Sequence, residues 1–190
     1  MGLPLRDHQH HTYADYLTWP DEERYELIDG VAYALTPAPG RRHQEVVVEM
    51  LRQIADALEG HPCRVYVAPF DVRLPRDSEA DEAVDTVVQP DLSVICDAAK
   101  LDEQGCRGAP DWVIEVLSPS TASHDQVKKR DVYERAGVKE LWLVHPMDGI
   151  VSVYTLEAGG YGKPRVTELE GRLPSVVLPG VEILWARVLR

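Results

Sequence analysis

The sequence lacks long apolar runs and a hydrophobic leader. No stretch of about 18 consecutive apolar residues occurs, which excludes an ordinary transmembrane helix. The first residues, MGLPLRDHQHHTYADYL, do not contain the apolar core of a signal peptide. These two absences predict a cytoplasmic protein with no membrane partner.

Cysteine and aromatic residues are also scarce. Cys63, Cys96 and Cys106 are an odd number without CxxC spacing, so we expect reduced thiols and neither a disulfide nor a zinc site. Aromatic residues make up 7% of the chain and Phe occurs once, which disfavours the aromatic-rich sugar cleft of a glycoside hydrolase. The patterns GxSxG, GxxxxGK[ST] and GxGxxG are missing as well, which argues against hydrolases with a nucleophile elbow and against common nucleotide-binding loops.

Basic residues are outnumbered by acidic ones. The 20 Lys and Arg residues face 32 Asp and Glu residues, for a formal net charge of -12. The acidic segment 77–85, DSEADEAVD, supplies part of this charge, and the remainder still carries about -7. Such a chain does not coat nucleic acid nonspecifically, because the phosphates are repelled. Any nucleic-acid site should therefore be a confined patch.

What the sequence does contain is a regular series of predicted helices and strands. The length of 190 residues suits a single domain over 1–190, of which we expect residues 1–11 to form a flexible tail. Apolar periodicity and turn residues predict helices from 13 to about 20, at 41–60 and at about 124–136, hairpins turning at Asp29-Gly30 and Asp148-Gly149, and strands at 64–74, 87–96, 111–117 and 138–146. The order predicts an α/β (or α+β) domain around one mixed sheet.

Three acidic residues lie where strands should be apolar. They are Glu26 in YELIDG, Asp91 in QPDLSVI and Glu115 in VIEVL. Each alone could face solvent at a strand edge or pair with an arginine. Glu115 fits that explanation least, because its neighbours on both faces are apolar, and a buried carboxylate costs several kcal/mol unless it has a partner. Together the three acids predict oxygen ligands for Mg²⁺ or Mn²⁺, which would be the missing partner.

The helix after Glu115 adds a lysine to this picture. At 100° per residue, Lys129 lies on the apolar side of the helix with Val132 and Tyr133. We expect Lys129 to lean toward the sheet, where its ammonium would orient a water or stabilise phosphate charge. The alternative is a lysine that extends along the helix edge into solvent.

Other basic residues are candidates for contacts to a ligand phosphate. Lys128 and Arg130 fall roughly 100° to either side of Lys129 on the helix. Arg41 and Arg42 begin the helix 41–60, next to His43 on its apolar face. His43 is either a hydrogen-bonded core histidine or an accessory group near the site, and the sequence leaves both possibilities open.

These motifs resemble those of the Uma2 family, also called DUF820, of restriction-endonuclease-like proteins. The resemblance runs from about Tyr25 to Pro146 and rests on the segments YELIDGVAYALTPAPGRRHQEVV, QPDLSVI, DWVIEVLSPST and DQVKKRDVYERAGVKELWLVHP. EVLSPST is followed by Asp125, by Lys129 four residues later and by Tyr133 eight residues later. This spacing is quite specific for the family.

The resemblance implies a PD-(D/E)xK nuclease fold, with a mixed central sheet flanked by helices. It implies that Asp91 and Glu115 bind Mg²⁺ (or Mn²⁺), with Glu26 as an additional acid and Tyr133 as a possible accessory residue. The parent motif has Lys two residues after its acid, where this chain has Leu117, and Lys129 on the following helix takes its place. The implied activity is metal-dependent hydrolysis of phosphodiester bonds, foremost in DNA.

Two alternatives share the same fold. One is a catalytically silent nucleic-acid-binding or assembly module, which the acidic balance and the displaced lysine favour. The other keeps the chemistry and acts on RNA or branched nucleic acid. A homodimer is compatible with the apolar C-terminal segments SVVL and VEILWARVL, which could equally complete the core.

Overall fold

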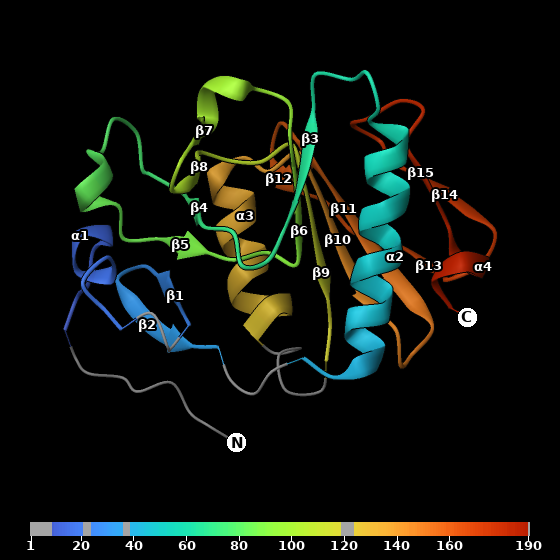
Figure 1. The fold of residues 1–190 in the computed structure, drawn as a ribbon, viewed down its shortest axis with the longest axis horizontal. Coiled ribbons are helices and arrows are strands. Elements are labelled where there is room, and N and C mark those ends of the chain that lie inside the picture. Colours follow the sequence, from blue (N-terminus) through green and yellow to red (C-terminus); the bar gives the residue numbers. More distant parts are fainter. Residues whose placement is uncertain (1–8, 21–23, 36–38, 119–123, 190) are drawn as a thin grey trace.

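The computed structural model describes residues 9–20, 24–35, 39–118 and 124–189, and it contains mixed sheets with few helices (Figure 1). The larger sheet has seven strands in the order β12-β11-β10-β9-β6-β3, with β13 also paired to β11. Its strands are β3 (Arg64–Val67), β6 (Leu92–Ile95), β9 (Trp112–Val116), β10 (Glu140–His145), β11 (Ile150–Glu157), β12 (Gly160–Tyr161) and β13 (Arg165–Glu168). The β9–β10 pair is parallel and the other ladders are antiparallel, so the sheet is mixed.

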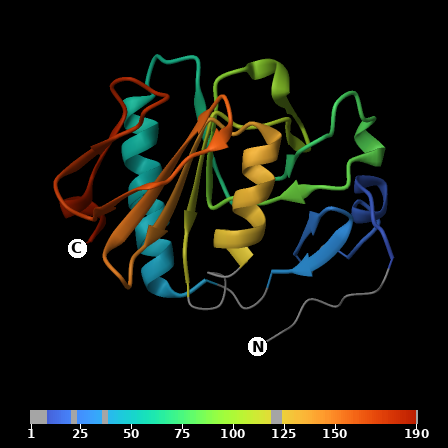
Figure 2. The same ribbon diagram turned by 180° about the vertical axis from the view of Figure 1, so that it is seen from behind.

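Helices cover both faces of this sheet, as the two opposite views show (Figures 1 and 2). Helix α2 (Arg41–Ala57) packs on one face, where Trp112, Ile114 and Val116 of β9 join its core. The opposite face of β9 belongs to a second core, together with α3 (Arg130–Ala136). Because alternate residues of a strand point to opposite faces, Glu115 lies on the α3 side, within that second core.

A second sheet, with six strands, carries the N-terminal hairpin. Its order is β2-β1-β5-β4-β8-β7. The strands are β1 (Tyr25–Ile28), β2 (Val31–Ala34), β4 (Val72–Arg73), β5 (Val87–Val88), β7 (Leu101–Asp102) and β8 (Gly105–Arg107). The predicted hairpin turn is confirmed, since Ile28 pairs with Val31 and both Asp29 and Gly30 have positive φ, as a tight two-residue turn requires.

The expectation of one mixed sheet was wrong, and two prolines explain the error. The segments 64–74 and 87–96, each predicted as one strand, are interrupted at Pro69 and at Pro90. Proline has no N–H to donate to a ladder, so each segment leaves one sheet and continues in the other. The chain thus crosses from β3 to β4 and from β5 to β6, and the second crossing places Asp91 directly before β6.

The helices differ from prediction mainly at their ends. Helix α1 is only Tyr13–Tyr16, whereas the predicted helix runs to about Pro20. The predicted helix 124–136 begins with a π-helical turn, η3 (His124–Lys129), and continues as α3 to a C-cap at Gly137 with φ 90°. Two short 3₁₀ turns, η1 (Asp81–Ala83) and η2 (Ala98–Lys100), lie in connections.

Both ends of the described chain lie against the fold. Of the predicted tail, residues 1–8 are outside the description, whereas the His11 N–H donates to the Gly30 carbonyl at 2.9 Å. The C-terminal β14 (Arg172–Pro174), β15 (Glu182–Leu184) and α4 (Trp185–Val188) pair and pack beside α2, with Ile183 and Trp185 fully buried in the first core. No helix in the described ranges is long and apolar enough to cross a bilayer.

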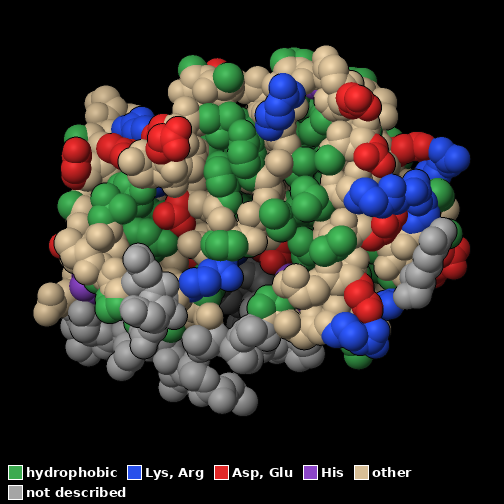
Figure 3. All heavy atoms as spheres, viewed as in Figure 1, with side chains coloured by type: hydrophobic (Ala, Val, Ile, Leu, Met, Phe, Trp, Pro, Cys, Tyr) green, Lys and Arg blue, Asp and Glu red, His purple; other side chains and the backbone are tan. Residues whose placement is uncertain are grey.

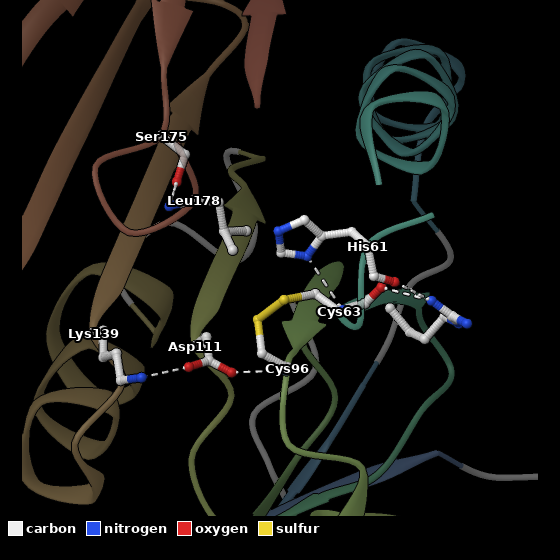
Figure 4. Close-up of a disulfide and its surroundings, with 8 residues drawn as sticks. His61, Cys63, Cys96, Asp111, Lys139, Ser175 and Leu178 are labelled. Atoms are coloured by element: carbon white, nitrogen blue, oxygen red, sulfur yellow. Dashed lines mark hydrogen bonds and ion pairs between the residues drawn. A yellow bond between two sulfur atoms is a disulfide. The ribbon is translucent and has the colours of Figure 1, made fainter. Parts of the chain in front are cut away.

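The prediction of reduced thiols was wrong for two of the three cysteines. Cys63 and Cys96 form a disulfide (Figure 4). They directly precede and follow the paired residues Arg64 and Ile95, so the antiparallel register of β3 and β6 brings them face to face. Spacing along the sequence does not reveal such a long-range register. Cys106 is free, and burial raises the pKa of its thiol to about 11.

Reducing the disulfide should lower the free energy of unfolding by about 2–4 kcal/mol, because the bridge joins residues 33 positions apart and restricts the unfolded chain. Urea unfolding with and without a phosphine reductant measures the difference. The Cys63→Ala/Cys96→Ala variant should not respond to the reductant. Unfolded but unreduced protein should expose one reactive thiol, that of Cys106, and three reactive thiols would contradict the bridge.

Candidate functional site

The centre of the site is the ammonium group of Lys129, which lies between two carboxylates. Its Nζ is 2.9 Å from Glu26 Oε1 and 2.7 Å from Glu115 Oε1. All three residues are buried, with exposed fractions of 0% for Glu26, 2% for Glu115 and 3% for Lys129. Glu26 comes from β1 of the six-stranded sheet and Glu115 from β9 of the seven-stranded sheet. Lys129 therefore joins the two sheets through a buried ion-pair triad.

Glu115 has two further partners. The Tyr133 hydroxyl donates to Glu115 Oε1 at 2.5 Å, and the Asp91 N–H points to Glu115 Oε2 at the longer distance of 3.5 Å. Burial first, and then the Glu115 carboxylate, raise the pKa of Tyr133 well above its ordinary value. Tyr133 consequently stays protonated and donates. Lys129 and Tyr133 are thus partners of the buried Glu115 carboxylate, for which the sequence had predicted a divalent cation.

Asp91 is the most accessible acid of the group, with 20% of its side chain exposed. Its Oδ2 accepts the Val116 N–H at 2.7 Å and lies 3.1 Å from His43 Nε2. His43 belongs to the first turn of α2 and is 11% exposed in its side chain. Of the two possibilities left open for His43, the structure shows a histidine that contacts the site.

Glu26 is positioned by the Pro90 crossing. The Gln89 N–H donates to Glu26 Oε1 at 2.8 Å, just before the chain leaves β5 for β6. Gln89 and Val116 hold the acids through main-chain groups, so sequence reasoning missed both. A proline interrupting an apolar strand next to an acid was the available signal for Gln89.

The basic candidates lie at different distances from this cluster. Lys128 donates to the Tyr33 hydroxyl at 2.8 Å, and its Nζ lies 4.2 Å from the centre of the Tyr33 ring. Because Tyr33 is the register partner of Glu26, the structure places Lys128 beside the triad. Arg130 instead pairs with Asp131 at 2.5 Å and approaches Glu134 at 3.4 Å.

At the start of α2, Arg41 pairs with Glu45 at 2.6 Å and is well exposed, while Arg42 is half-buried. Farther along the helix, Arg52 pairs with Glu49 and Asp56. On the face shown in Figure 3, basic side chains are interspersed with acidic ones and do not form one field.

Comparison with known proteins agrees with this architecture. The family model Uma2, described as "Putative restriction endonuclease", matches residues 13–186. A crystal structure of "a putative nuclease belonging to DUF820" from Anabaena variabilis superposes with a TM-score of 0.74 at 21% identity, covering 94% of this chain and 97% of that one. At that identity the likeness concerns the fold.

An uncharacterized protein, slr1290, from Synechocystis sp. (strain ATCC 27184 / PCC 6803 / Kazusa) is 26% identical over 121 residues. The match covers 63% of this chain and 60% of that protein, so the chain spans less than two thirds of its relative. The Uma2 match extends over most of the sequence and includes all four residues of the acid and lysine cluster. The chain belongs to the Uma2 family.

Proposed function

We propose that this chain is a Mg²⁺-dependent endonuclease, also active with Mn²⁺, that hydrolyses phosphodiester bonds in DNA. One observation carries the proposal: Lys129 contacts Glu26 and Glu115 from two sheets, and Asp91 lies beside them with its carboxylate partly exposed. We interpret these four residues as the acid and lysine set of a PD-(D/E)xK site, with the lysine supplied by the helix that follows the acid. The family description and the DUF820 fold likeness support it.

The residues fit a magnesium ion that keeps part of its water shell. Three carboxylates against one ammonium leave about two negative charges in excess, which a divalent cation would neutralise. The described residues contain no group of three His, Cys, Asp or Glu side chains arranged to enclose an ion. Mg²⁺ commonly needs only one or two carboxylates together with water and substrate phosphate. Asp91 and Glu115 would supply those carboxylates.

In this proposal the protein groups hold and orient the reacting atoms. Val116 and His43 fix Asp91 through Oδ2, and Asp91 Oδ1, which accepts no hydrogen bond from the described residues, would be the oxygen that binds the cation. Lys129 and Tyr133 fix Glu115, and Glu26 holds Lys129 in place. The bound cation supplies Lewis-acid activation of the phosphoryl group and of a water. Lys129 positions that water or steadies negative charge in the transition state.

Phosphate contacts outside the cluster are assigned to Lys128, Arg41, Arg42 and Arg130. Lys128 is best placed, because it lies beside the triad with a neutral phenol as its hydrogen-bond partner. A phosphate would replace that phenol with a charge-assisted bond. Arg130 would first have to leave Asp131, so we expect its contribution to be smaller.

Glu115→Gln should reduce metal-dependent cleavage by at least about a hundredfold, because it removes one ligand charge while keeping the side-chain shape. The assay measures nicking of supercoiled plasmid and cleavage of duplex, single-stranded and RNA oligonucleotides with Mg²⁺, Mn²⁺ or EDTA. Asp91→Asn should behave likewise. Asp148→Asn, on the exposed β10–β11 turn, is the matched control and should cleave normally. Cleavage that survives Glu115→Gln would rule out the mechanism.

The second candidate is a catalytically silent binding or assembly module. It is favoured by the complete pairing of Lys129 with two carboxylates and by the lack of a three-donor cluster in the described ranges. It predicts no cleavage of any of these substrates and no heat of Mn²⁺ binding in calorimetry. Wild-type heat that disappears in Asp91→Asn would count against it.

A further inference from the structure

A hollow of about 320 Å³ is lined in part by Gln89, whose main-chain N–H donates to Glu26 of the acid and lysine cluster. The described residues that line it take no part in the proposed mechanism. Its walls come from three places: residues 69–71 between β3 and β4, Gln89 at the end of β5, and residues 102–105 in the β7–β8 turn. No Lys or Arg is among the described residues that line it, whereas Asp71, Asp102 and Glu103 are. Such walls repel a phosphate but admit an uncharged group that carries N–H donors.

One wall of the hollow is aromatic. Phe70 is half-buried and stacks on Tyr66, with ring centroids 4.3 Å apart and planes 12° from parallel. The stack fixes the orientation of the Phe70 ring at the edge of the hollow. A nucleobase stacks on such a ring whatever its identity, because every base has a π-face.

Another wall offers a hydrogen-bond acceptor. Asp71 Oδ1 accepts the Tyr16 hydroxyl at 3.0 Å and Gln89 Nε2 at 2.8 Å. Asp71 Oδ2 accepts no bond from any residue the structure describes. The other end of Gln89 is also occupied, because Arg24 donates twice to its Oε1. Asp71 is therefore held rigidly with one acceptor oxygen available.

Gln89 connects this hollow to the candidate active site. Its side chain holds Asp71, and its main-chain N–H holds Glu26. Asp91 follows two residues later, which in extended chain is about 7 Å. A second link runs through Ala68, whose N–H donates to the Asp91 carbonyl at 3.2 Å. Ala68 directly precedes Pro69, which lines the hollow. A single nucleotide can span this separation.

We propose that the hollow binds one unstacked nucleobase with an exocyclic amino group, adjacent to the phosphate that a cation on Asp91 would bind. The base would stack on Phe70 and donate its amino group to Asp71. Carboxylates accept from amino groups such as N4 of cytosine, whereas thymine presents carbonyl oxygens there. This deepens the proposed function and rests on it: the substrate is single-stranded or branched DNA, because a base inside a duplex cannot enter the hollow.

The test is fluorescence anisotropy with labelled oligo-dC, oligo-dA, oligo-dT and a mixed-sequence duplex, using protein that carries Glu115→Gln to prevent hydrolysis. We expect oligo-dC and oligo-dA to bind about tenfold more tightly than oligo-dT, and the duplex to bind weakly. Asp71→Asn should remove the preference for amino bases. Phe70→Ala should weaken binding to every single strand by about tenfold, and Phe70→Leu serves if Phe70→Ala does not fold.

Asp148→Asn is the charge-matched control and should leave both affinity and preference unchanged. Equal affinity for oligo-dC and oligo-dT, or unaltered binding in the Phe70 and Asp71 variants, would overturn the proposal. Spermidine is a cation that could occupy the acidic hollow. If it binds there without weakening oligonucleotide binding, the proposal is overturned too. Base preference without cleavage would retain the hollow and reject the nuclease, and cleavage without base preference would do the reverse.

Discussion

Replacing Lys129 with Met should lower the free energy of unfolding by about 3–5 kcal/mol and abolish metal-dependent cleavage. The substitution leaves Glu26 and Glu115 buried without the ammonium between them, and an uncompensated buried charge has a penalty of that size. Chemical denaturation at pH 8, followed by circular dichroism, measures the first effect. The cleavage assay with plasmid and oligonucleotide substrates measures the second.

The loss of stability caused by Lys129→Met should be smaller at pH 5 than at pH 8. A carboxyl that is buried without its cation binds a proton more tightly in the folded state, so stability recovers as pH falls. Adding Glu26→Gln and Glu115→Gln to Lys129→Met should restore part of the stability at pH 8 without restoring cleavage. Lys128→Met is the matched control, because Lys128 is only half-buried and bonds a phenol, and it should change stability by less than about 1 kcal/mol. A Lys129→Met protein as stable as wild type would contradict the buried triad.

Replacing Glu140 with Ala should lower the free energy of unfolding by about 3–5 kcal/mol, although Glu140 is remote from any proposed chemistry. The Glu140 side chain is fully buried and accepts bonds from Trp142 Nε1 at 2.6 Å and Ser175 Oγ at 2.7 Å. It also accepts the main-chain N–H groups of Val176 and Val177 at 2.9 and 3.0 Å. Removing the acceptor leaves several buried donors unpaired, each of which costs about 1–3 kcal/mol before relaxation.

The same experiment distinguishes charge from hydrogen bonding. Glu140→Gln keeps the shape and one acceptor oxygen, so we expect a smaller loss than for Glu140→Ala. Glu157→Ala, at the exposed end of β11, is the control and should stay within about 0.5 kcal/mol of wild type. Thermal unfolding of all three variants provides the comparison. A Glu140→Ala variant as stable as wild type would mean that the 175–178 turn does not depend on this carboxylate.

Much of the site was predictable because its side chains interrupt strong local patterns. Glu115 is the charged residue among the five consecutive buried positions of β9. The helical wheel predicted that Lys129 faces the sheet, and Lys129 is buried. The wheel assumed 100° per residue, whereas η3 is π-helical, and Lys129 is nonetheless inward. The direction of a side chain at the junction of η3 and α3 was thus predicted even though the local winding was not.

The rest depended on contacts between distant segments. The separation into two sheets follows from Pro69 and Pro90, whose missing N–H groups were visible in the sequence but not weighed. The disulfide depends on the register of β3 against β6, which no local pattern fixes. The contact of His43 with Asp91 joins the first turn of α2 to the start of β6 and is likewise a tertiary property.

Because the chain crosses between the sheets at Pro90, the acid and lysine cluster takes its residues from both sheets. Glu26 belongs to the six-stranded sheet and Glu115 to the seven-stranded sheet, and the ammonium group of Lys129 contacts both. Under the proposed function neither sheet alone contains all the reactive groups, so we expect a fragment that retains only one of the two sheets to be inactive. Cleavage by the proposed nuclease would then report whether the two sheets are joined.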